Sequence, residues 1–208
     1  MTPPTGEALR KMLEGKRLLI FDFDGTLADT SPLHEAAFNA VLAPWGLRVD
    51  YPAIAGLRTW DALAACLAAA GVSVPESKLR ELMLSKQTHA RTLIQRDLRP
   101  LPGVDEFLRW ARPRYRLALC SSGSRGTVAI ALQTLGYTGW FDPMLCAEDV
   151  THGKPDPEGY LKVLALTGVD AANTLVFEDS DLGLDAAQCA GLANLDIRTA
   201  PFEVICIG

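Results

Sequence analysis

The chain has 208 residues, of which 49% are hydrophobic and 22% are charged. This composition is globular rather than disordered, and the length allows one α/β domain with an insertion or two small domains. The formal net charge of -5 argues against a nucleic-acid surface but leaves the charge of a small substrate open.

The cysteine pattern and the lack of long apolar runs favour a reducing compartment inside the cell. The cysteines are scattered without a Cys-x-x-Cys pair, as is typical of reduced thiols; they are Cys66, Cys120, Cys146, Cys189 and Cys206. The longest apolar run, 62–70, is about half the length of a membrane span. The charged N-terminus does not resemble a signal peptide. We therefore expect a soluble, cytoplasmic monomer or weak dimer with no membrane partner.

The first strand of the chain is predicted to end in two acids. A short amphipathic helix is expected over residues 5–15, followed by an apolar run over 17–21. This run has the pattern of a strand buried on both faces of a parallel sheet. It ends at Asp22 and Asp24, and then at Gly25, which suits a sharp turn.

Residues 31–98 are predicted to form a separate helical module. Apolar side chains recur at helical spacing in stretches that begin near residues 31, 59 and 75, and no convincing strand interrupts them. A proline-rich turn at 100–103 returns the chain to its earlier pattern. We expect a helical cap domain over 31–98, inserted between core segments 1–30 and 99–208.

After the module, strand and helix patterns alternate. Strands are predicted at 115–120, 143–147, 174–177 and 202–207, and segment 192–201 is expected to delay the last of them. The alternation predicts an α/β fold, with a three-layer Rossmann-like core, a mostly parallel sheet and right-handed crossovers. Such a sheet carries its site along the carboxyl ends of the strands.

Polar clusters stand at the predicted strand ends or in the adjacent loop: Asp22 with Asp24, Ser121, Lys154, and Glu178 with Asp179. Taken singly, each has an ordinary explanation as a solvated turn, a helix cap or an exposed lysine. Paired carboxylates at a buried strand end resist joint ionisation unless a cation or proton intervenes, which favours Mg2+. Together the clusters supply a nucleophile, an acid/base, phosphate-binding groups and metal carboxylates.

In these motifs the chain resembles the haloacid dehalogenase superfamily. The matching segments are Asp22-Phe23-Asp24-Gly25-Thr26-Leu27, Ser121 at a strand end, Gly153-Lys154-Pro155-Asp156-Pro157, and Glu178-Asp179-Ser180-Asp181-Leu182-Gly183. The chain is most similar to the phosphoglycolate phosphatase and β-phosphoglucomutase branch, whose helical cap follows the first motif. The resemblance covers nearly the whole chain.

The resemblance implies a role for each catalytic position. Asp22 would be the nucleophile and form an aspartyl-phosphate, while Asp24 would protonate the leaving oxygen and then activate water. Ser121 and the amide of Ser122 would hold phosphate oxygens, and Lys154 would offset the charge of the phosphate and of Asp22. An aspartate at position 24 points to phosphate esters, because the dehalogenases of the superfamily do not keep one there.

The resemblance also implies a Mg2+ site. Asp22, the main-chain carbonyl of Asp24 and Asp179 would be ligands, and Glu178 would be either a ligand or a neighbour of the ligands. Mg2+ prefers oxygen ligands and keeps several waters, so a few carboxylates and a phosphate satisfy it.

Two cap residues are candidates for substrate contacts. His34 stands where the mutases of this branch carry a histidine, and the alternative for it is a buried helix histidine. Arg58 lies near the expected specificity loop.

The predicted activity is Mg2+-dependent hydrolysis of the phosphate monoester of a small metabolite. A phosphomutase of the β-phosphoglucomutase type would use the same residues, although Thr26 favours a phosphatase. A catalytically idle binding or regulatory protein is the alternative from another class. Unused buried carboxylates would only destabilise such a protein, which argues against it.

Overall fold

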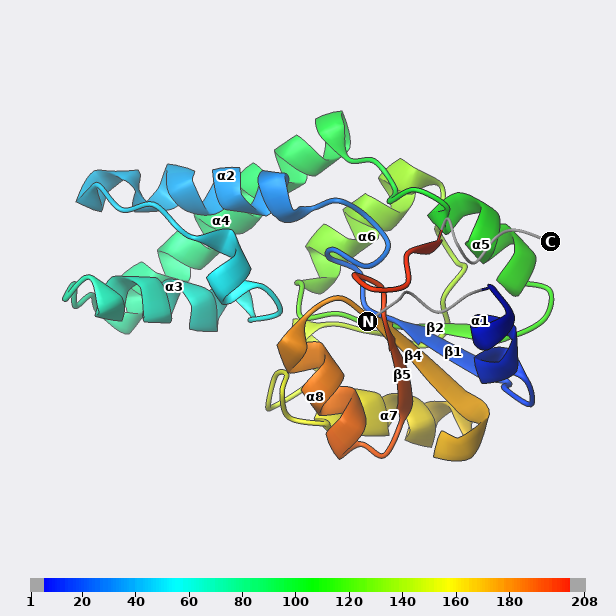
Figure 1. Ribbon diagram of the computed structural model, residues 1–208. Helices are drawn as coiled ribbons and strands as arrows, with labels where there is room; N and C mark the ends of the chain where they lie inside the picture. The colour runs from blue at the N-terminus through cyan, green and yellow to red at the C-terminus, as the bar shows by residue number, and fades with distance from the viewer. Residues whose placement is uncertain (1–5, 203–208) are drawn as a thin grey trace.

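The structure, a computed structural model, describes residues 6–202, and a five-stranded parallel sheet forms its centre (Figure 1). In spatial order the strands are β3 (Met144–Leu145), β2 (Arg116–Cys120), β1 (Leu18–Phe21), β4 (Thr174–Glu178) and β5 (Ala193–Asp196). Phe21 of β1 lies opposite Leu119 of β2 and Phe177 of β4. Because the three central strands are parallel and in register, their carboxyl ends open on one edge of the sheet.

Helices cover both faces of the sheet and complete the predicted three layers. One face carries α1 (Gly6–Leu13), α5 (Val104–Ala111) and α6 (Arg125–Leu135), and the other carries α7 (Glu158–Thr167) and α8 (Asp181–Cys189) (Figure 1). The side chains of β1 alternate between the two apolar clusters: Leu19 and Phe21 pack with α1, α5 and α6, whereas Leu18 and Ile20 pack with α7 and α8. Burial on both faces explains why this strand has an uninterrupted apolar sequence.

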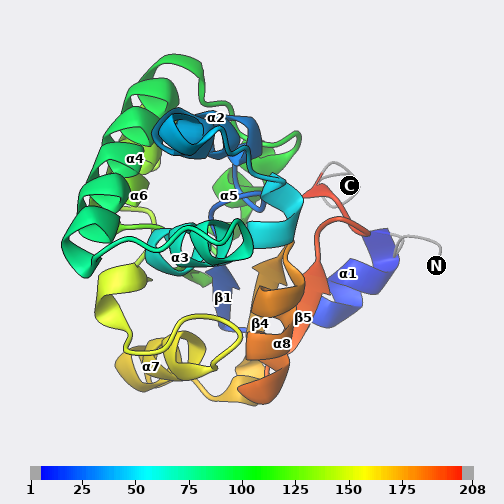
Figure 2. The same cartoon turned by 90° about the vertical axis from the view of Figure 1, so that its left-hand side faces the viewer.

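A helical unit is inserted between β1 and β2 and stands to one side of the sheet (Figures 1 and 2). It contains α2 (Ser31–Leu42), α3 (Thr59–Ala69) and α4 (Glu76–Asp97), and no strand forms within 31–98, all of which the structure describes. The unit has an apolar cluster of its own, which includes Phe38, Leu63 and Leu82. The predicted all-helical cap is therefore present.

The two linkers between core and cap pair with each other. Ala28 and Pro100 form an antiparallel bridge, and the Leu101 amide donates to the Leu27 carbonyl at 3.1 Å. Both chain crossings are thus fixed at one place beside the end of β1. No helix among residues 6–202 is long and apolar enough to cross a membrane.

The C-terminal edge of the sheet differs from the prediction. The expectation that segment 192–201 delays the last strand is wrong, because β5 begins two residues after Gly191. The sequence Ala-Asn-Leu-Asp has little strand propensity, and backbone pairing with β4 forms the strand instead. The strand predicted at 202–207 lies outside the described residues apart from Phe202.

Candidate active site

The carboxyl ends of β1 and β4 bring three carboxylates together around one lysine. Oxygens of Asp22, Glu178 and Asp179 all lie within 4.8 Å of one another. Lys154, from the loop before α7, donates from Nζ to Asp22 Oδ1 at 2.6 Å and also contacts Glu178 Oε1. The side chains of Asp22 and Lys154 are only 9% and 6% exposed. Negative charge therefore exceeds positive charge in a nearly dry site.

This imbalance changes the pKa values of the groups. Burial, with Glu178 and Asp179 nearby, raises the pKa of Asp22, although Lys154 acts against the shift. Burial and then Glu178 raise the pKa of Asp179 to about 6. Burial opposes the charge of Lys154, but Asp22 and Glu178 outweigh it and raise the pKa of the lysine. A divalent cation would relieve the remaining repulsion, and oxygen donors are the ligands that Mg2+ prefers.

Glu178 differs from the other two acids because both of its oxygens already have partners. Oε1 contacts Lys154 and accepts a hydrogen bond from the Tyr160 hydroxyl at 3.1 Å. Oε2 accepts from the amides of Asp179 and Ser180 at 2.9 and 3.0 Å, and from the Ser180 hydroxyl at 3.0 Å. The side chain is fully buried. This arrangement suits a residue that holds Lys154 in place.

Asp179 lies over the turn that follows β1. Its Oδ1 accepts a hydrogen bond from the Thr26 hydroxyl at 2.9 Å. A Cβ atom at Gly25, where φ is +84°, would lie 2.1 Å from Asp179 Oδ2. Any side chain at position 25 would therefore displace the acid, which explains the glycine after the two acids. A Cβ at Gly183 would lie 1.8 Å from Glu178 in the same way.

Asp24 forms a chain of hydrogen bonds with two cap residues. His34 Nε2 lies 2.9 Å from Asp24 Oδ1, and Lys86 Nζ on α4 lies 2.8 Å from His34 Nδ1. An ammonium group has only donors, so Nδ1 accepts and Nε2 carries the proton that is donated to Asp24. Both cap side chains are buried. His34 is thus both a buried helix histidine and a direct contact of Asp24.

The pKa values follow from these contacts. Burial and then Lys86 lower the pKa of His34, and burial lowers the pKa of Lys86 to about 8. Burial favours the protonated form of Asp24, but His34 favours its carboxylate, and the net result is a pKa of about 2. Before substrate binds, Asp24 is therefore ionised and His34 is neutral.

Sequence reasoning did not find Lys86, although the sequence contains a signal for it. The buried face of α4 consists of Leu79, Leu82, Lys86, Ala90 and Ile94, at spacings of three and four residues. A lysine on an otherwise apolar helical stripe is rarely buried without a partner. Its partner His34 is 52 residues away in sequence, so only the tertiary structure identifies it.

Ser121 and Ser122 follow β2, and Ser122 lines the same pocket as Asp24. The Ser121 hydroxyl is buried and accepts a hydrogen bond from the Gly123 amide at 2.9 Å. A Cβ at Gly123 would lie 3.1 Å from Ser121 Oγ and 3.3 Å from Asp24 Oδ2, so these two groups flank the glycine. The lining of this pocket also includes Asp22 and His34.

Arg58 lies at the mouth of the site rather than beside the acids. Its Nη1 donates to the Thr151 carbonyl at 3.1 Å, and its Nε donates to Asp61 at 2.8 Å. The side chain also packs against Gly153, the residue before Lys154. The cap therefore contacts the loop that carries the catalytic lysine candidate.

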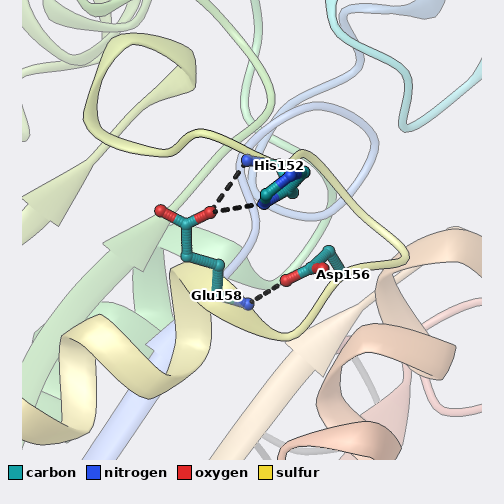
Figure 3. Close-up of side chains that lie close together, drawn as sticks. All are labelled: His152, Asp156 and Glu158. Atoms are coloured by element: carbon teal, nitrogen blue, oxygen red, sulfur yellow. Dashed lines mark hydrogen bonds and ion pairs between the residues drawn. The ribbon is translucent and has the colours of Figure 1, made fainter.

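A second cluster, drawn in Figure 3, lies in the Lys154 loop and at the start of α7. The Glu158 carboxylate accepts from the amides of Thr151 at 2.9 Å and His152 at 2.8 Å, and it pairs with Lys162 at 2.5 Å. His152 Nδ1 lies 3.4 Å from the same carboxylate. The Glu158 oxygens are thus occupied by loop amides and a lysine, and this arrangement suits a clamp on the loop better than a metal site.

Comparison with known proteins places the chain in a family. The family described as haloacid dehalogenase-like hydrolases matches residues 19–196. The chain belongs to this family. The fructose-1-phosphate phosphatase YqaB of Escherichia coli strain K12 is 35% identical over 186 residues, which span 86% of this chain and 95% of that protein.

Solved structures of the family have the same fold. CbbY from Rhodobacter sphaeroides, in complex with phosphate, is similar at a TM-score of 0.79 and 26% identity, over 86% of this chain and 84% of the other. The β-phosphoglucomutase of Clostridium difficile has a TM-score of 0.79 at 23% identity, over 88% and 86% of the two chains. The predicted fold and branch of the family are confirmed, and so is the predicted enzyme class, a phosphatase.

Proposed function

We propose that this haloacid dehalogenase-like phosphatase hydrolyses phosphate monoesters of small sugars, with Mg2+ and through an aspartyl-phosphate on Asp22. The observation that carries the proposal is the buried carboxylate of Asp22, held 2.6 Å from Lys154 at the carboxyl end of β1. The similarity to a fructose-1-phosphate phosphatase supports a sugar phosphate as substrate.

In the proposed first step an oxygen of Asp22 attacks phosphorus, and the bond from phosphorus to the sugar oxygen breaks. Asp24 gives its proton to that oxygen, and the sugar leaves as an alcohol. Asp24 is ionised before substrate binds, and the charge of an incoming phosphate beside it raises its pKa so that it can carry the proton. In the second step Asp24 takes a proton from water, which attacks the phospho-aspartate and releases inorganic phosphate.

The other predicted site residues compensate the charge of the phosphate. The Ser121 hydroxyl and the Ser122 amide bind its oxygens, and Lys154 lies beside the nucleophile. Asp22, Asp179 and the carbonyl of Asp24 would hold Mg2+, which neutralises phosphate charge when bound. We assign Glu178 to positioning Lys154, because its oxygens are already bonded.

We further propose that residues 31–98 act as a cap over the core segments 1–30 and 99–208. Cap and core contact each other around the pocket, where Arg91 Nε donates to Thr127 Oγ1 at 3.2 Å and Gly56 packs against Ser180. The cap also supplies His34 and Arg58, which would contact the substrate or the acids that act on it. Closure of such a cap excludes water while the phosphoryl group is transferred.

Two conservative variants test the mechanism. Asp22→Asn should lower turnover by at least about a thousandfold without unfolding the protein, because the amide cannot act as nucleophile. Asp24→Asn should reduce hydrolysis of a sugar phosphate far more than that of an activated aryl phosphate, whose leaving group needs little protonation. Asp185→Asn, on the exposed side of α8, serves as control. Equal losses on both substrates would contradict the role of Asp24 as an acid.

The same assay separates the alternative functions. Conversion of a hexose 1-phosphate to its 6-phosphate without net phosphate release would identify a mutase. Failure to release phosphate from an aryl phosphate and from a broad metabolite panel, with Mg2+ present, would instead favour a binding protein.

A further inference from the structure

A second cavity, here called the outer groove, opens between the cap and the loop after β3. Its cap side is lined by Trp60 on α3 and by Met83 and Leu84 on α4, and Ala147 of the core lies across from them. Leu84 is 55% exposed and is one of the few large apolar side chains on the described surface. An apolar wall of this kind beside an active site marks a place where a ligand is bound.

The outer groove also contains charged and polar groups. Arg58, Gln87 and Glu148 line it together with the apolar residues. Glu148 Oε2 is fixed by the Arg125 amide at 2.9 Å, so its carboxylate has a defined position. A purely apolar occupant would remove water from these groups without replacing their hydrogen bonds, which is costly. The groove therefore suits a ligand with an apolar face and a polar edge.

The outer groove adjoins the pocket that contains Asp22 and Asp24. Thr59, Gln87, Ser122 and Ser124 line both cavities. Figure 2 shows α3 between α4 and the segment that precedes α7. A substrate with its phosphate beside Asp22 would therefore reach the outer groove past Ser122.

We infer that the outer groove binds a second sugar ring, so that the preferred substrate is a phosphorylated disaccharide or glycoside rather than a single sugar phosphate. This inference rests on the proposed function. The C–H face of a pyranose ring packs against the indole of Trp60 and the Leu84 side chain, while its hydroxyl groups bond to Gln87 and Glu148. The apolar side chains of the groove are then covered, and its polar side chains have hydrogen-bond partners.

The test compares kcat/KM for glucose 6-phosphate and trehalose 6-phosphate in the wild type and in groove variants. We expect the wild type to prefer the disaccharide phosphate by about tenfold, the range that one apolar contact supplies. Trp60→Ala and Leu84→Ser should abolish this preference and leave the single-ring substrate unchanged, whereas Trp60→Phe should retain most of it. Leu166→Ser is the matched control, because Leu166 is 61% exposed on α7, away from the groove.

Each outcome decides one question. No preference in the wild type, or an equal loss on both substrates in the groove variants, would overturn the second-ring subsite while leaving the phosphatase intact. If the wild type sediments as a dimer and the Leu84→Ser variant as a monomer, the groove is instead the interface with a second copy of the chain. Absence of phosphate release from either sugar phosphate and from an aryl phosphate would contradict the proposed function itself.

Discussion

Replacing Asp179 with asparagine is expected to stabilise the metal-free protein and to remove its response to Mg2+. Asparagine has nearly the same shape, and its oxygen can still accept the hydrogen bond from Thr26, which lies 2.9 Å from Asp179 Oδ1. The loss of charge is the main change. The difference in free energy of unfolding between the variant and the wild type therefore measures how much the charged carboxylate destabilises the folded protein.

The magnitude follows from the pKa of Asp179, which burial and Glu178 raise from 3.8 to about 6. Because the pKa is higher in the folded state, folding favours the protonated acid. That stabilisation is present below a pH of about 4 and is lost as the pH rises through about 6. About 2 pH units at 1.36 kcal/mol each give about 3 kcal/mol. Asp179→Asn keeps this stabilisation at every pH.

Urea unfolding in chelator and in Mg2+, followed from about pH 4 to about pH 8, provides the assay. In chelator the variant should exceed the wild type by up to about 3 kcal/mol at the upper pH, and the difference should vanish at the lower one. With Mg2+ the wild type should gain stability by mass action and the variant should gain little. Asp185→Asn is the control. A variant less stable than wild type in chelator at the upper pH, or an equal Mg2+ response, would refute the reasoning.

Two further predictions concern residues that position the catalytic groups. Lys86→Met should lower kcat on a sugar phosphate by about tenfold to a hundredfold and affect an aryl phosphate less, because the Lys86 ammonium no longer donates to His34 Nδ1. Lys78→Met, at a partly exposed position on the same helix, is the control, and equal effects on both substrates would argue against the hydrogen-bond chain to Asp24. Glu158→Ala should lower kcat by about tenfold or more as the Lys154 loop loosens, with Glu158→Gln partly active. Unchanged kinetics in Glu158→Ala would exclude the clamp.

The sequence by itself determined where the acids stand. An uninterrupted apolar run such as Leu18–Phe21 becomes a strand buried on both faces, and the residues after it must lie at the carboxyl edge of a parallel sheet. That local rule was sufficient to bring Asp22 and Asp179 together. The helical insertion could also be predicted from the sequence, because 3.6-residue periodicity is a local property.

Only the tertiary structure decided how each group is used. Lys86 reaches His34 because α2 and α4 pack together, and Trp60 and Ala147 line one cavity only because the cap lies beside the core. Strand β5 exists through pairing with β4, since its own residues favour no strand. Such contacts join segments far apart in the chain, and no local pattern encodes which distant partner will neutralise a charge or cover an apolar face.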